Sequence, residues 1–153
     1  MSTLSCHSVS DVVDFAIAKE EKAVEFYRQC AERAKNPGIK EFFREMVAEE
    51  EKHRDMLKNL DSLKLDEVKL KQVENLKISD YLVDVPFSDN VTYQEALIIA
   101  MKKEEKALAF YSGWKNKCIS EQASRLFQLL ENEEEKHKRK LEKLYDEEIL
   151  SWD

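Results

Sequence analysis

Apolar residues recur at helical spacing in four stretches of the chain, with polar residues at the positions between them. A capping box at residues 8–11, with Asp in place of the usual Glu, precedes the first stripe and predicts a helix over about residues 9–35. Asn36 before Pro37 combines an N-cap with a proline at the first helical position, which predicts a second helix over about 37–60. The link is so short that the two helices form an antiparallel hairpin.

A second hairpin is predicted in the C-terminal half. Thr92 and Glu95 form another capping box, which opens a helix over about residues 92–116. Ser120 is the predicted N-cap of a fourth helix, over about residues 120–149. The few residues between these two stretches again predict antiparallel neighbours.

Residues 61–90 lack a clean period and are predicted to be a crossover between the hairpins, with room for a short helix. Two hairpins joined by one long crossover define the ferritin-like form of the antiparallel four-helix bundle, whereas an up-down bundle needs only a short middle loop. The predicted fold is therefore all-α, with residues 1–153 forming a single domain. A helical repeat array is disfavoured because only two copies of the repeat fit in the chain.

Composition narrows the range of partners. The chain has 37% charged residues but a formal net charge of -7, which argues against nucleic acid or an anionic membrane because no basic face is segregated. The three cysteines include no C-x-x-C pair, which excludes a rubredoxin-type iron site and indicates a reduced, intracellular protein. No leader-like segment and no apolar run of about 20 residues occurs. We expect a cytoplasmic protein.

The two hairpins are built from a repeated sequence. "AIAKEEKAVEFY" at residues 16–27 and "AMKKEEKALAFY" at residues 100–111 match at eight of twelve positions with an offset of 84. "EEEKH" at residues 49–53 recurs at residues 133–137 with the same offset. The sequence therefore predicts two copies of one hairpin, related by a pseudo-twofold axis.

Helical phase separates the acidic residues that face the core from those that face solvent, because positions three, four and seven apart share a face. Six polar residues interrupt the apolar stripes and are predicted to point inward: Glu20, Glu50, His53, Glu104, Glu134 and His137. Their acidic neighbours fall off the stripes and are predicted to face solvent: Glu21, Glu49, Glu51, Glu105, Glu133 and Glu135.

Four ionised carboxylates in an apolar core need a compensating charge, because each buried unpaired ion costs several kcal/mol. Two divalent cations would neutralise them, and the two imidazoles would complete a shell of oxygen and nitrogen ligands. One Glu from each of two helices plus Glu-x-x-His from each of the other two is the known di-iron or di-manganese constellation. The absence of thiolate ligands favours two iron ions, with manganese second.

Other interpretations of these residues compete with the metal site. A single Glu-x-x-His on a Glu-rich helix usually belongs to a solvated face; two copies in register, each with a partner Glu on an apolar stripe, favour a metal site. Tyr27 and Tyr111 lie two turns beyond Glu20 and Glu104. Their simplest role is core packing, and a phenol in this position can also donate a hydrogen bond to a metal-bound carboxylate.

The chain resembles the rubrerythrin-like branch of the ferritin-like di-iron proteins over nearly its whole length, through "KEEKAVEFY", "AEEEKH", "KKEEKALAFY" and "NEEEKH". The resemblance implies that Glu20 and Glu104 are terminal ligands and that Glu50 and Glu134 bridge the two ions. It also implies that His53 and His137 each bind one ion. Members of this family reduce peroxide or activate dioxygen at the metal pair.

The sequence departs from the rubrerythrin pattern in two ways. Rubrerythrins carry an additional Glu three residues after the ligand on the third helix, where this chain has Ala107. Glu131, one turn before Glu134, is the candidate to substitute for it from the fourth helix. Rubrerythrins also carry a rubredoxin domain, which this sequence lacks, so an external donor, a rubredoxin-like protein or a reductase, is needed.

The sequence is compatible with three functions. The first is an oxidoreductase that reduces hydrogen peroxide or dioxygen at the di-metal centre, and the resemblance favours it. The second is a ferroxidase that feeds an iron-storage cage, as in ferritins. The third is a bundle that the metals stabilise without turnover. We expect a homodimer, the default for such bundles.

Overall fold

The computed structural model describes residues 9–60, 91–117 and 121–147. The described residues form four helices and no strand: α1 (Val9–Arg33), α2 (Pro37–Lys58), α4 (Tyr93–Trp114) and α5 (Glu121–Glu147). The predicted all-α, four-helix architecture is confirmed. The predicted crossover at 61–90 and the predicted caps Ser8 and Ser120 lie outside the described residues.

Two of the helix starts follow directly from local sequence. The Asn36 side chain accepts hydrogen bonds from the backbone N–H groups of Gly38 (2.8 Å) and Ile39 (3.2 Å), with Pro37 at the first helical position. Thr92 and Glu95 form a reciprocal capping box, with distances of 2.9 and 3.0 Å. Both arrangements satisfy backbone donors that have no partner within the helix.

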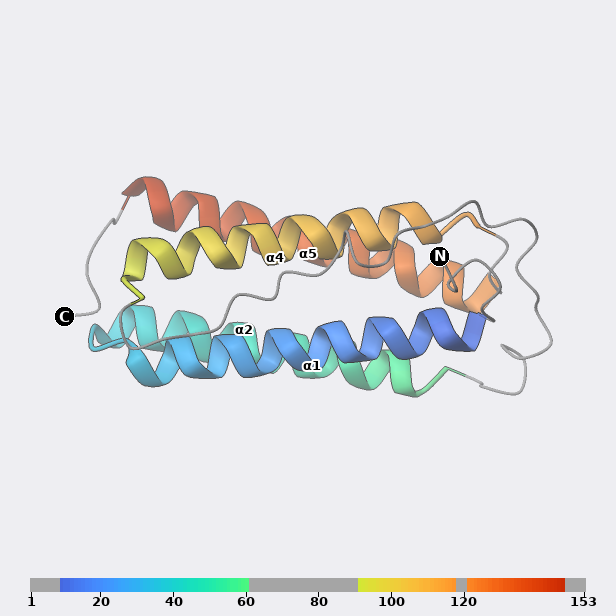
Figure 1. The fold of residues 1–153 in the computed structure, drawn as a ribbon, viewed down its shortest axis with the longest axis horizontal. Coiled ribbons are helices and arrows are strands. Elements are labelled where there is room, and N and C mark those ends of the chain that lie inside the picture. Colours follow the sequence, from blue (N-terminus) through green and yellow to red (C-terminus); the bar gives the residue numbers. More distant parts are fainter. Residues whose placement is uncertain (1–8, 61–90, 118–120, 148–153) are drawn as a thin grey trace, which may run out of the picture.

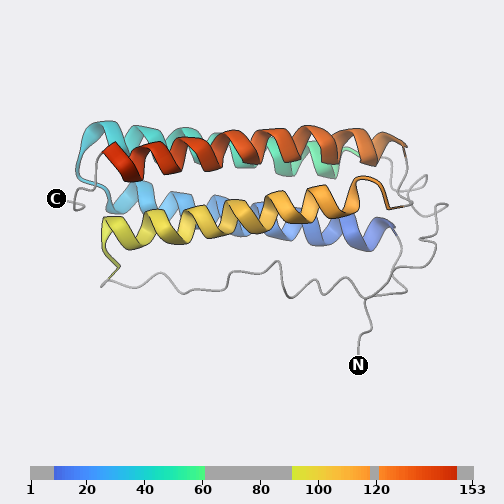
Figure 2. The same ribbon diagram turned by 90° about the horizontal axis from the view of Figure 1, so that it is seen from above.

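The helices pack as two antiparallel hairpins, α1 with α2 and α4 with α5, which form the two layers of the bundle (Figure 1). Seen from above, α2 and α5 run along one side of the bundle and α1 and α4 along the other (Figure 2). Chain direction reverses within each pair, so α2 is antiparallel to α5 and α1 to α4. No described helix has the length and apolar character that crossing a membrane requires.

The apolar core is divided into two clusters, and every helix contributes to both. One cluster includes Val12, Leu57, Phe110 and Phe127, and the other includes Phe26, Phe43, Leu97 and Leu141. Along each helix, a buried Glu lies between the residues of the first cluster and those of the second. The fold therefore places a polar layer at mid-length of the bundle, between the two apolar clusters.

Replacing Asn36 by Ala is expected to lower the free energy of unfolding by about 1 kcal/mol, because two N-terminal N–H groups of α2 lose their acceptor. Urea denaturation of the metal-free protein measures this change. Asn132→Ala, in the exposed middle of α5, is the matched control and should not destabilise the protein. An equal loss in both variants would contradict the capping role.

Candidate metal centre

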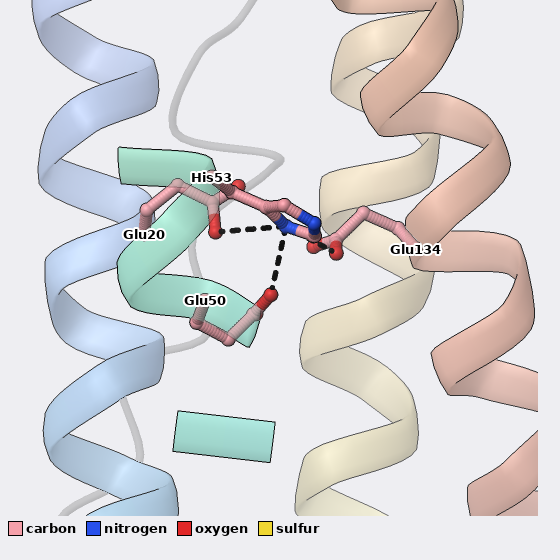
Figure 3. A group of neighbouring side chains, drawn as sticks. All are labelled: Glu20, Glu50, His53 and Glu134. Atoms are coloured by element: carbon pink, nitrogen blue, oxygen red, sulfur yellow. Dashed lines mark ion pairs between the residues drawn. The ribbon is translucent and has the colours of Figure 1, made fainter. Parts of the chain in front are cut away.

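The structure buries all six residues that the helical phase predicts to point inward. None has more than 2% of its surface exposed: Glu20, Glu50, His53, Glu104, Glu134 and His137. One comes from α1, two from α2, one from α4 and two from α5. They gather in the polar layer between the two apolar clusters, and four of them are drawn in Figure 3.

The six residues form two overlapping groups, in each of which one possible ligand atom per residue lies within 4.8 Å of the others. The first group consists of Glu20, Glu50, His53 and Glu134, and the second of Glu50, Glu104, Glu134 and His137. Glu50 and Glu134 belong to both groups. They lie where two ions would share ligands, and each remaining Glu and His pair serves one group.

Equivalent distances in the two groups follow the pseudo-twofold relation. His53 Nδ1 lies 3.1 Å from Glu50 Oε1 and 3.4 Å from Glu134 Oε1 (Figure 3). His137 Nδ1 lies 3.2 Å from Glu134 Oε1 and 3.5 Å from Glu50 Oε1. Each histidine thus faces the Glu of its own helix and the shared Glu of the opposite hairpin. The sequence repeat is expressed in the geometry of the cluster.

One atom from each of the six side chains is buried without a hydrogen-bond partner. These atoms are the Oε1 atoms of the four glutamates and the Nδ1 atoms of the two histidines, the same atoms that converge in the two groups. Buried polar atoms are rarely left unsatisfied without a reason such as an ion. A set of four carboxylate oxygens and two imidazole nitrogens, without thiolates, fits iron or manganese.

The pKa values of the cluster show how strongly its charges interact. Burial and the charge of Glu134 raise the pKa of Glu50 well above its usual range, and the same two causes raise the pKa of Glu104 to about 7. Burial disfavours charge on His53 and His137, yet the surrounding carboxylates raise their pKa values to about 10 and about 12. Without a metal, protons supply the positive charge that the carboxylates require. Metal binding displaces such protons.

Tyr27 and Tyr111 combine both roles that the sequence left open. Each is fully buried in one of the two apolar clusters. Tyr27 Oη donates to Glu104 Oε2 (2.6 Å), and Tyr111 Oη donates to Glu20 Oε2 (2.5 Å). Each phenol holds the carboxylate of the opposite hairpin by one oxygen, so that the other oxygen, Oε1, is left for the centre of the cluster.

Glu49 and Glu133 are partly exposed, as the helical phase predicts, but each also faces a histidine of the other hairpin, which the helical phase does not predict. Glu49 Oε1 lies 2.5 Å from His137 Nε2, and Glu133 Oε1 lies 4.0 Å from His53 Nε2. Because α2 and α5 are antiparallel, the first Glu of each "EEEKH" lies beside the His of the other copy. Helical phase considers one helix at a time and cannot reveal such a contact between helices.

Glu131 is not brought into either group of the cluster. Its Oε1 atom instead accepts a hydrogen bond from Lys115 Nζ at 2.6 Å. Ala107, at the position of the additional rubrerythrin Glu, is buried and packs in the apolar cluster that contains Phe110. Among the described residues, the two groups therefore contain the six predicted side chains and no further carboxylate.

The family model named Rubrerythrin matches residues 11–145. The chain belongs to the rubrerythrin family. No curated protein matches this rubrerythrin-family chain significantly.

Solved structures share the fold of this family member. A protein of Thermotoga maritima described as a ferritin-like diiron-carboxylate protein has 24% identity and a TM-score of 0.73, with 94% of this chain and 97% of that chain covered. A protein of Pyrococcus furiosus has 26% identity and a TM-score of 0.68, covering 91% and 89%. The ferritin-like predicted fold is thereby confirmed.

A two-domain protein of Anabaena variabilis, with DJ-1/ThiJ/PfpI-like and ferritin-like domains, is also similar. It has 14% identity and a TM-score of 0.65, and the match covers 90% of this chain but 36% of that one. This similarity concerns the fold alone.

Replacing both shared glutamates, Glu50→Gln together with Glu134→Gln, is expected to abolish stabilisation of the protein by Fe²⁺ or Mn²⁺. A ligand that binds only the native state adds about 2.7 kcal/mol at a hundredfold excess over its Kd, and a chelator should remove this gain from the wild type. Anaerobic thermal unfolding with and without metal measures it. The control Glu51→Gln with Glu135→Gln removes the same number of charges at half-buried neighbours that belong to neither group, and it should retain the gain. Metal stabilisation that survives in the Glu50 and Glu134 variant would contradict the assignment.

Glu49→Gln is expected to weaken metal binding about 10- to 100-fold, because the carboxylate orients His137 through Nε2. Glu133→Gln should have a smaller effect, since Glu133 is 4.0 Å from His53. Anaerobic metal titration compares the two variants with Glu45→Gln, an exposed position one turn before Glu49. Equal affinities in all three would show that Glu49 does not position the histidine.

Proposed function

We propose that this chain is a non-haem di-iron carboxylate oxidoreductase that reduces hydrogen peroxide or dioxygen with electrons from an external donor. The observation that carries the proposal is the convergence of six buried ligand atoms without hydrogen-bond partners in two groups that share Glu50 and Glu134. Membership of the rubrerythrin family supports it.

Charge balance supports two divalent ions in the cluster. Four carboxylates bring four negative charges when ionised, and two divalent cations cancel them without residual charge in the apolar bundle. The oxygen-rich donor set with two imidazoles favours iron, with manganese as the second choice. Glu50 and Glu134 would be the shared ligands, with Glu20 and His53 on one ion and Glu104 and His137 on the other.

The reaction that follows is a two-electron reduction. Hydrogen peroxide, two protons and two electrons give two molecules of water, and the O–O bond is the bond that breaks. Bound redox-active ions would supply the two electrons and stabilise negative charge on oxygen. Tyr27 and Tyr111 hold the terminal carboxylates in place, and the two apolar clusters limit the access of bulk water from the ends of the bundle.

Each turnover consumes two electrons that the bundle must recover. The sequence contains no C-x-x-C pair with which to build a rubredoxin-type site. We therefore propose an external donor, a rubredoxin-like protein or a reductase. A cytoplasmic homodimer remains our expectation for the protein in the cell.

A single-turnover experiment tests this function. The protein is loaded anaerobically with Fe²⁺, the iron per chain is determined, and stoichiometric hydrogen peroxide or dioxygen is added in a stopped-flow spectrophotometer. We expect two ions per chain and oxidation of both by one equivalent of peroxide. The Glu50→Gln and Glu134→Gln double variant should lose the reaction, whereas Glu51→Gln with Glu135→Gln should keep it.

The same experiment distinguishes the alternatives. Two bound ions that neither oxidant oxidises would overturn the proposal in favour of a metal-stabilised bundle. Oxidation followed by growth of a mineral inside a cage-like assembly would instead indicate iron storage. Gel filtration of the product separates a cage from a small oligomer.

A further inference from the structure

A groove lies between α2 and α5 and reaches the candidate metal centre from the side of the bundle. Its volume is about 380 Å³, and His53 is one of its lining residues. The same His53 belongs to the ligand group of Glu20, Glu50 and Glu134. The imidazole ring of His53 therefore lies between the cluster and the groove.

The groove has an apolar part at the protein surface. Leu129 is 41% exposed, which makes it the most exposed large hydrophobic residue among those that the structure describes. Met56, on the opposite wall, is half-buried. An apolar centre with a charged rim is the pattern of a protein interface.

The lining of the groove has three lysines and two glutamates, a net charge of +1, although the chain as a whole carries a formal charge of -7. Lys52, Lys136 and Lys140 line it together with Glu49 and Glu133. The two glutamates are the ones that face the histidines, and their side chains are 38% and 28% exposed. Lys136 pairs with Glu133 (3.1 Å) and Lys140 with Glu49 (3.9 Å). The two lysine side chains are 65% and 53% exposed, so the ammonium group is the more exposed member of each pair.

We propose that the α2/α5 groove is the docking surface for an acidic, one-electron donor protein. This inference rests on the proposed function, because only that function requires an electron donor. The three lysines attract the acidic partner, Leu129 and Met56 provide the apolar contact, and His53 provides the connection to the metal ligands. Two donor molecules each lose one electron for every peroxide that takes up two protons and becomes two waters.

A binding measurement tests the surface independently of turnover. An acidic rubredoxin is the probe, titrated into the metal-loaded protein by isothermal calorimetry at low and at high ionic strength. The groove variant is Lys52→Glu with Lys136→Glu, and the control is Lys22→Glu with Lys102→Glu, which makes the same change in net charge at exposed positions of α1 and α4. We expect at least about tenfold weaker binding for the groove variant at low salt, near wild-type binding for the control, and a smaller difference at high salt.

Leu129→Glu is a second variant, and it tests the apolar contact without altering a lysine. It should weaken binding to a similar extent, whereas Gln122→Glu, an exposed position at the start of α5, should not. Reduction of the oxidised protein by reduced rubredoxin should slow in parallel. Reduction by hexaammineruthenium(II), a small cation, should not slow in the groove variants.

The outcomes separate failure of this inference from failure of the proposed function. Rubredoxin binding that is absent, or equally affected in groove and control variants, overturns the docking surface even when peroxide turnover is present. Groove-dependent binding supports the surface even when the single-turnover reaction fails. If the groove variant converts a wild-type oligomer into monomers in sedimentation velocity, the groove is a contact between copies of the chain and the proposal is overturned.

Discussion

The burial of four carboxylates in an apolar bundle is the constraint on which the rest of this structure depends. Glu20, Glu50, Glu104 and Glu134 are at most 2% exposed. Two histidines share their polar layer, and no lysine or arginine among the described residues is as fully buried. Without a metal, the carboxylates raise the pKa values of both histidines, while burial together with the charge of Glu134 raises the pKa of Glu50, so protons supply the positive charge. Two divalent ions would remove this conflict, because each carboxylate oxygen without a partner then gains one.

Each hairpin provides side chains that position the buried residues of the other hairpin. Each provides the tyrosine that donates a hydrogen bond to the unshared Glu of the other, through the pairs Tyr27 with Glu104 and Tyr111 with Glu20. Glu49 on α2 likewise reaches His137 on α5. Neither hairpin contains a complete site, so the ligand geometry depends on how the hairpins pack. This dependence couples metal binding to the association of the two halves of the bundle.

The ends and the α2/α5 side of the bundle differ in how close the polar layer lies to the surface. The apolar clusters close the polar layer toward both ends, whereas the α2/α5 side has a groove with His53 on its wall. The polar layer is thus enclosed at both ends, and one polar side chain lies between it and the groove. In the docking that we propose, the lysines of the groove and exposed Leu129 would form the surface that the donor protein contacts.

The sequence by itself determined the four helices, the repeat and the six inward-facing residues, because a buried Glu on an apolar stripe is visible from helical period alone. It also predicted the Asn36 and Thr92 caps, whose hydrogen bonds are local. Only the tertiary structure decided which residues meet between helices. It placed partly exposed Glu49 against His137, paired Glu131 with Lys115 outside the cluster, and brought the charged and apolar residues of the groove together. The physical reason is that helical phase fixes the direction of a side chain about its own axis, whereas the partner it meets depends on the antiparallel register of α2 and α5.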